Sequence, residues 1–167
     1  GGKTAMKFSL LFPQKVEKLI VVDIAPKLYF PDFKNIMNGY NYLDLDSLRS
    51  RSEIDNIYKS FVGDNFLRSF LMKNIYRDNE GKFRLRINFK VLEKKITEIG
   101  SFDHKNLVFE KPTAFIKGSK SDYILSNDEN LIKRSFPKYS IHEVSDAGHW
   151  VHHDNPRAFE IIVKSLL

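Results

Sequence analysis

The chain of 167 residues is long enough to bury one domain-sized hydrophobic core, and its 42% hydrophobic content argues against a disordered protein. It contains no cysteine, which excludes disulfide scaffolds and thiolate chemistry. No apolar run reaches the roughly 18 residues that a membrane-spanning helix requires.

The net charge of +6 is carried by the middle of the chain. Residues 49–95 contain twelve Lys or Arg and six Asp or Glu, so the flanking segments are close to neutral together. This distribution is typical of solvated helix faces. A cap that attracts anionic substrates and a basic surface that binds an acidic membrane are the alternatives. No nucleic-acid-binding motif accompanies the basic residues, so a nucleic-acid partner is not expected.

The first elements alternate between helix and strand. Residues 3–12 have a helical period, and Pro13 ends the predicted helix. The apolar side chains on one side of that helix are Ala5, Phe8, Leu11 and Phe12. Residues 19–24 are almost continuously apolar, which is typical of a strand inside a parallel sheet that helices cover on both faces.

The last third of the chain continues this alternation. Further strands are predicted at residues 113–117 and 139–144, and helices at about 127–135 and 156–167. Asn155 is the expected N-cap of the final helix, with Pro156 in its first turn. Its buried stripe is predicted to consist of Phe159, Ile162, Val163 and Leu166. The order of strands and helices predicts an α/β fold with a mostly parallel sheet.

Residues 28–105 interrupt the α/β pattern with mostly helical sequence. The apolar positions of three predicted helices are Ile54, Ile57, Tyr58 and Phe61, then Phe66, Phe70 and Leu71, then Phe89, Leu92, Ile96 and Ile99. Residues 83–87 alternate strictly, which favours a short strand or an extended arm. The expected organisation is a core formed by residues 1–27 and 106–167, with residues 28–105 as a helical cap or lid over an active site.

His149 is the candidate general base. It follows the predicted strand 139–144 and the short loop 145–148, and it precedes the final helix. A general base needs a loop position at the carboxyl edge of the sheet, where its ring can reach a nucleophile. His152 and His153 are close in sequence and are interpreted as surface histidines.

Two aspartates are candidates for the acid that orients His149. Asp23 lies at the carboxyl end of an otherwise apolar strand, where a buried carboxylate requires a partner such as an imidazolium. Asp122 follows the next core strand, residues 113–117. The pattern alone leaves both open, because either carboxylate can instead cap a helix or contact water.

The nucleophile is the missing member of this set. Residues 1–6 (GGKTAM) are typical of the downstream half of a nucleophile elbow, G-x-S-x-G, and the elbow runs directly into a helix. No complete G-x-S-x-G motif occurs in the 167 residues. The expectation is therefore that the serine lies two residues before Gly1 and that this chain alone is inactive.

The chain resembles the small-esterase branch of the α/β-hydrolase superfamily, which includes bacterial carboxylesterases and lipase-like mitochondrial hydrolases. The matching stretches keep the order of the family and cover almost the whole chain. They are residues 1–6 (GGKTAM), 21–26 (VVDIAP), 50–53 (SRSE), 70–74 (FLMKN), 84–88 (RLRIN) and 148–152 (GHWVH). The resemblance implies that Asp23 is the acid rather than Asp122, that His149 is the base, and that no residue of this chain is the nucleophile.

The activity implied by this resemblance is hydrolysis of carboxylic esters or thioesters of acyl groups, without metal or cofactor. A non-catalytic binding or scaffold protein with the same fold is the alternative. The apolar strand 19–24 is expected to lie at an open sheet edge, which invites pairing with another strand. The sequence therefore predicts an oligomer, or pairing with a further part of the same protein.

Overall fold

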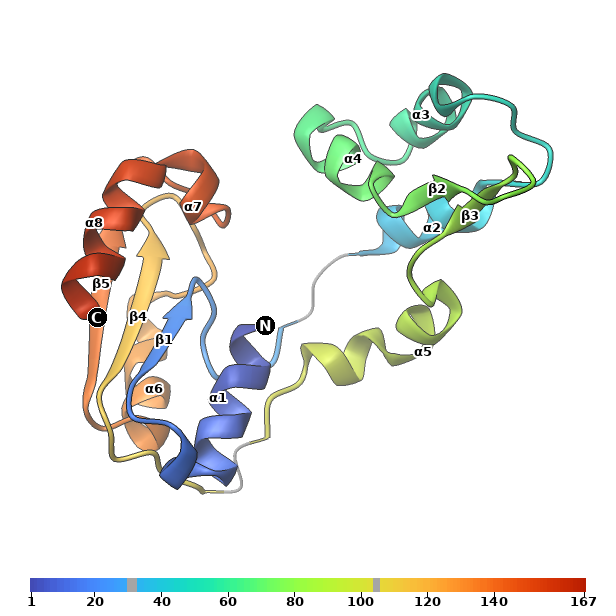
Figure 1. The fold of residues 1–167 in the computed structure, drawn as a ribbon. Helices are drawn as coiled ribbons and strands as arrows, with labels where there is room; N and C mark the ends of the chain where they lie inside the picture. Colours follow the sequence, from blue (N-terminus) through green and yellow to red (C-terminus); the bar gives the residue numbers. More distant parts are fainter. Residues whose placement is uncertain (30–32, 104–105) are drawn as a thin grey trace. The chain divides into compact units, whose positions relative to one another are not determined.

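The computed structural model describes residues 1–29, 33–103 and 106–167, which form two compact units (Figure 1). The core unit consists of Gly1–Leu28 and Ser101–Leu167. The insertion unit consists of Tyr29–Gly100. The expected division at residues 28–105 differs from these limits by a few residues. Within the core unit, the Nζ atoms of Lys3 and Lys7, in the first helix, donate to the carbonyl oxygens of Ser101 and Asp103.

A three-stranded parallel sheet forms the centre of the core unit. Its strands are β1 (Leu19–Val22), β4 (Thr113–Gly118) and β5 (Tyr139–Val144), in the order β1-β4-β5. Leu19 is in register with Thr113, and Thr113 is in register with Tyr139. The strands therefore end at one common edge, and the loops that follow them meet there. The predicted parallel α/β architecture is confirmed.

Helices cover both faces of this sheet (Figure 1). On one face, α8 (Pro156–Leu166) packs on β-strand residues that include Ile20, Ile116 and Val144. The other face carries α6 (Glu129–Ser135), which follows the short 3-10 helix η2 (Ser126–Asp128). Phe136 comes directly after α6, and its ring centroid lies 5.8 Å from that of Phe115 in β4. Asn155 caps α8 by accepting from the Ala158 N–H, as predicted. The predicted apolar stripe of α8 faces the sheet but is partly rather than fully buried.

The first helix, α1 (Gly2–Leu11), buries a different side from the predicted one. Met6, Ser9 and Leu10 are buried. Phe8, Leu11 and Phe12 remain 44%, 48% and 42% exposed. α1 packs on β1, and the second apolar row of the helix is left at the surface. Pro13 opens a 3-10 helix, η1 (Pro13–Lys15), and ends α1 as predicted.

The insertion unit is mostly helical, as predicted. Its elements are α2 (Lys34–Tyr42), α3 (Arg51–Lys59), α4 (Asn65–Met72), β2 (Ile75–Arg77), β3 (Phe83–Leu85) and α5 (Phe89–Gly100). The predicted extended segment at 83–87 forms β3, which pairs antiparallel with β2. Tyr58, Ile54 and Phe83 are fully buried at the centre of this unit.

Local capping explains where the insertion helices begin. Ser50 accepts from the Glu53 N–H at the start of α3, and Asp64 accepts from the Leu67 N–H at the start of α4. The buried Arg68 guanidinium is satisfied by Asp55, Asn65 and the carbonyls of residues 62 and 63. Among the helices of the described ranges, none combines the length and the apolar character that crossing a membrane requires.

Candidate active site

Asp23 lies directly after β1, at the edge where the parallel strands end. Its backbone has a positive φ of 48°, which turns the chain out of the sheet, and an aspartate tolerates this conformation better than most residues. The side chain is 0% exposed. Oδ1 accepts from the Gly118 N–H at 3.2 Å, and Oδ2 accepts from the Ser121 hydroxyl at 2.5 Å. These donors compensate the loss of solvation of the buried carboxylate.

His149 reaches the same carboxylate from the loop after β5. Its Nδ1 lies 2.8 Å from Asp23 Oδ2. The two residues are 126 positions apart in the sequence, and the parallel register of β1, β4 and β5 brings their loops together. The structure thus joins the two residues that the resemblance selects.

The loop that carries His149 is fixed at both ends by hydrogen bonds. The Gly148 N–H donates to Asp154 Oδ2 at 2.8 Å, and the Asn155 amide donates to the Ser145 carbonyl at 3.0 Å. The Gly148 N–H also lowers the pKa of the Asp154 carboxyl, and the hydrogen bond with His153 adds to this effect. Asp154 ends the short helix α7 (Val151–Asp154), so this helix holds the loop from its carboxyl-terminal side.

Tyr123 covers one face of the His149 ring. The two ring centroids are 3.8 Å apart and the planes differ by 16°, which is a stacked arrangement. The His149 side chain is nevertheless 43% exposed. Because Nδ1 is bound to Asp23, Nε2 is the nitrogen that remains for a reacting group.

The other candidate residues lie away from this pair. Asp122 is exposed on the loop after β4 and makes no hydrogen bond with His149. His152 and His153 are exposed, and His153 Nδ1 is 3.2 Å from Asp154 Oδ1. Within the described part of the chain, no group of three or more His, Asp or Glu side chains is arranged to hold a metal ion.

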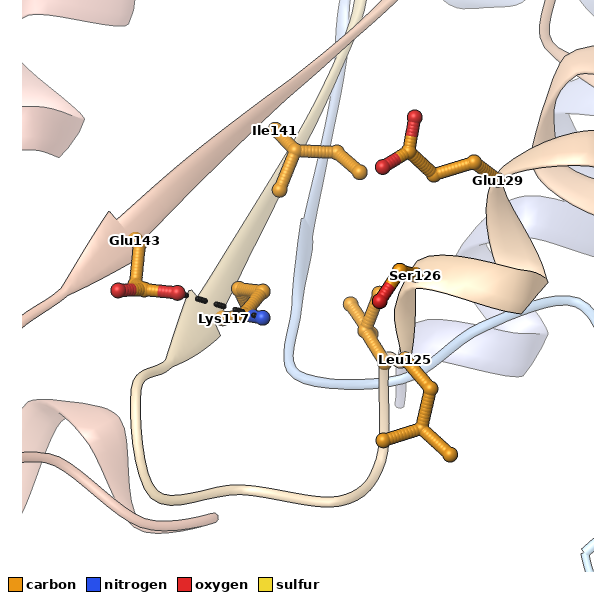
Figure 2. A pocket seen from close by; sticks show the side chains of 7 residues that line it. Lys117, Leu125, Ser126, Glu129, Ile141 and Glu143 are labelled. Carbon is orange, nitrogen blue, oxygen red and sulfur yellow. Dashed lines mark ion pairs between the residues drawn. The ribbon is translucent and has the colours of Figure 1, made fainter.

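A cavity of about 270 Å³ in the core unit is separate from the Asp23–His149 pair. Figure 2 shows its lining from β4, β5, η2 and α6, with an ion pair of 3.3 Å between Lys117 and Glu143. Neither Asp23 nor His149 lines it. Lys117 and Glu143 are in register on neighbouring strands, so their ion pair is a cross-strand contact of the sheet rather than part of the candidate site.

Known proteins are similar to this chain in sequence and in structure. No protein-family model matches the chain. An abhydrolase domain-containing protein of Schizosaccharomyces pombe is 33% identical over 95% of this chain and 61% of its own length. The sn-1-specific diacylglycerol lipase ABHD11 of Mus musculus is 34% identical over 100% of this chain and 56% of its own length. The chain therefore spans little more than half the length of the curated relatives it matches.

A solved structure decides the family. The structure of a marine microorganism esterase superposes with a TM-score of 0.94 at 36% sequence identity, and the match covers 100% of this chain and 67% of that esterase. The chain belongs to the esterase family of α/β-hydrolases. The fold class, the resemblance and the hydrolase assignment predicted from sequence agree with these relatives.

Three residues of this α/β-hydrolase site were not predicted from sequence. Gly118, Ser121 and Tyr123 all belong to the end of β4 or to the loop that follows it. The sequence pattern singles out only Asp122 on that loop, because Asp122 carries the one carboxylate among residues 119–125. The position of the loop in the sequence was the signal that could have predicted these residues. Residues that follow a parallel strand lie at the same edge of the sheet as Asp23 and His149.

Gly118 is a position in the core unit where an added side chain would meet backbone atoms. A Cβ there would lie 2.3 Å from the carbonyl oxygens of both Ala147 and Gly148, which are backbone atoms of the His149 loop. We expect Gly118→Ala to destabilise the fold by about 1–3 kcal/mol. For a domain of this size that lowers Tm by about 2–10 °C in thermal unfolding followed by circular dichroism.

The matched control is Gly63→Ala, because an added Cβ there meets nothing within 4 Å. We expect its Tm to stay close to that of the unmodified chain. Equal melting temperatures for Gly118→Ala and Gly63→Ala would show that the His149 loop is not packed against β4 as described.

Proposed function

We propose that the protein is a serine hydrolase of carboxylic esters or thioesters, with His149 as its general base and Asp23 as the acid that orients it. The observation that carries the proposal is the hydrogen bond of 2.8 Å between His149 Nδ1 and Asp23 Oδ2. A buried carboxylate on one imidazole nitrogen, with the ring partly exposed to solvent, is the arrangement that serine hydrolases use to deprotonate their nucleophile.

The chemistry follows from which nitrogen each group contacts. The Asp23 carboxylate accepts from Nδ1–H, so the lone pair of His149 is held on Nε2. Nε2 takes the proton of a serine hydroxyl as its oxygen attacks the acyl carbonyl, and the imidazolium is stabilised by Asp23. The same proton then passes to the departing alcohol or thiol, and a second cycle with water releases the carboxylic acid.

The nucleophile in this proposal comes from sequence outside these 167 residues, which contain no G-x-S-x-G motif. One oxyanion donor is expected from the residue that follows the serine, and the other from a loop after an earlier strand. The curated relatives carry about two fifths of their length beyond the matched region, which leaves room for these elements. We define the serine-containing form as a longer form of the protein that includes the G-x-S-x-G segment.

The proposed substrates are small-molecule acyl esters. Mouse ABHD11 is named a diacylglycerol lipase, and the marine relative is named an esterase, so both lipid and simple esters are suitable test substrates. We further propose that the insertion unit acts as the lid. It contains an apolar cavity of about 170 Å³ whose lining includes Met37, Leu71 and Phe89, which suits an acyl chain.

The function is tested with p-nitrophenyl acetate, p-nitrophenyl butyrate and a diacylglycerol, assayed with the 167-residue chain and with the serine-containing form. We expect hydrolysis by the serine-containing form and none by the 167 residues alone. Loss of even one oxyanion donor typically lowers kcat by about a hundredfold or more, and the 167 residues contain no G-x-S-x-G motif.

Two results would overturn this proposal. Absence of hydrolysis in the serine-containing form would favour a binding or scaffold role for the fold. Hydrolysis by the 167 residues that disappears in His149→Ala would show that the nucleophile lies within this chain.

We also propose that the free edge of β1 pairs with another strand. Among the described residues, β1 is hydrogen-bonded to β4 on one side and to no strand on the other. An apolar strand with unpaired N–H and C=O groups is a template for a further strand. The exposed apolar side chains of α1, which packs on β1, enlarge the surface that such pairing would cover.

This pairing predicts that the 167-residue chain is not a monomer. We expect dimers or larger species in sedimentation velocity at micromolar concentration, and a shift toward the monomer for the serine-containing form, if its additional strands cover β1. A single monomeric species of the 167-residue chain would contradict the proposal.

A further inference from the structure

The loop after β4 contacts both members of the Asp23–His149 pair. Ser121, on this loop, donates from its hydroxyl to Asp23 Oδ2 at 2.5 Å. The Tyr123 N–H donates in turn to the Ser121 hydroxyl oxygen at 3.3 Å. The hydrogen bonds therefore run from the Tyr123 backbone through Ser121 to the carboxylate that His149 contacts.

The same loop is anchored to the segment that carries His149. The Lys120 N–H donates to the Ala147 carbonyl at 2.9 Å, and the Asp146 N–H donates to the Ser119 hydroxyl at 2.9 Å. Ile124, which follows Tyr123, is 1% exposed and fixes the far end of the loop in the core. These contacts hold the loop on both sides of Tyr123, and its ring stacks on His149 in that position.

We propose that Tyr123 is a positioning residue for His149: its ring supports one face of the imidazole, keeps Nδ1 directed at Asp23, and stabilises the imidazolium that forms during proton transfer. The rings lie 3.8 Å apart and 16° from parallel, so the π face of the phenol faces the imidazole. A cation above an aromatic face is attracted by the ring electrons, whereas a neutral imidazole gains much less.

The stack with Tyr123 differs from the other contacts of the His149 ring. Among the described residues, the groups that interact with its ring are the Asp23 carboxylate after β1, Tyr123 after β4 and the Trp150 ring, which is edge-on at 6.3 Å and 69°. Of these two aromatic rings, Tyr123 is the one whose face is parallel to the imidazole. Burial raises the pKa of the Tyr123 phenol, and the charge of Asp23 raises it further, so the ring stays uncharged at neutral pH.

The expected effect of Tyr123 on catalysis rests on the proposed function. Its test compares kcat of Tyr123→Leu with kcat of Tyr123→Phe in the serine-containing form. Leucine removes the π face, and phenylalanine keeps it while removing the hydroxyl. We expect Tyr123→Leu to lower kcat by about 5- to 30-fold with little change in KM, the range of a partly desolvated cation–π contact. Tyr123→Phe is expected to retain nearly full kcat.

A spectroscopic measurement on the 167-residue chain tests the stack without any catalysis. We expect the imidazole protons of His149 to be shifted upfield in NMR spectra of the unmodified chain and of Tyr123→Phe, because both place an aromatic ring over them. In Tyr123→Leu these signals are expected to move downfield, with the remaining dispersed signals unchanged.

The outcomes separate this inference from the proposed function. Equal loss of kcat in both variants would overturn the inference, because it would assign the effect to the hydroxyl. An unchanged kcat in Tyr123→Leu, or His149 signals that do not respond, would overturn it as well. The expected NMR shifts together with an inactive serine-containing form would retain the stack and reject the proposed hydrolase.

Discussion

His149→Ala is expected to abolish ester hydrolysis by the serine-containing form, with a decrease in kcat of about 10⁵- to 10⁶-fold. Alanine removes the only imidazole bound to Asp23 within the described residues, so nothing remains there to accept the serine proton. KM should change little, because the His149 ring contributes to proton transfer and not to holding the acyl group. The measurement is steady-state hydrolysis of p-nitrophenyl butyrate.

His152→Ala is the matched control for this loss. His152 is an exposed histidine three residues further along the chain, and its ring packs on Trp150 and Phe159 instead of a carboxylate. We expect its activity to be essentially that of the unmodified protein. A similar loss in both variants would mean that damage to this segment, and not removal of the base, explains the effect of His149→Ala.

Asp23→Asn is expected to decrease kcat by about 10⁴-fold while leaving the fold intact. The amide has the shape of the carboxylate and its oxygen still accepts a hydrogen bond. Its NH₂ group, however, donates to Nδ1 of His149 if it takes the place of Oδ2. That places the proton on Nε2, the nitrogen that must be unprotonated to act as a base.

Asp122→Asn provides the comparison for this prediction. Asp122 is the alternative acid on the loop after β4, but it is exposed and does not contact His149. We expect its kcat to stay close to that of the unmodified protein. A large loss for Asp122→Asn combined with a small one for Asp23→Asn would assign the acid to the loop after β4 and would require a different conformation of this site. Circular dichroism of both variants checks that the fold is retained.

Local sequence signals were sufficient for most of the elements. Pro13 ends α1, and Asn155 and Pro156 begin α8. These signals act within one helical turn, so they can be recognised without knowledge of the fold. Strands β1 and β4 were recognisable because they are almost continuously apolar, and β5 was recognisable because its apolar and polar residues mostly alternate.

The side of α1 that is buried was not predictable in this way. Two rows of apolar side chains compete for the interior, and packing on β1 selects Met6 and Leu10 over Phe8 and Leu11. The strand β2 was also missed, because it has three residues and becomes a strand only by pairing with β3.

By itself the sequence determined the α/β class, the position of the helical insertion, and the candidate residues Asp23, Asp122 and His149. Each of these depends on properties of short segments: apolar periodicity, capping residues, and a polar residue at the end of an apolar strand. Only the tertiary structure decided that Asp23, and not Asp122, lies against His149, and that Ser121 and Tyr123 surround the pair. Residues separated by about a hundred positions meet there because three parallel strands end at one edge, and the register of those strands is a property of the whole sheet and of no single segment.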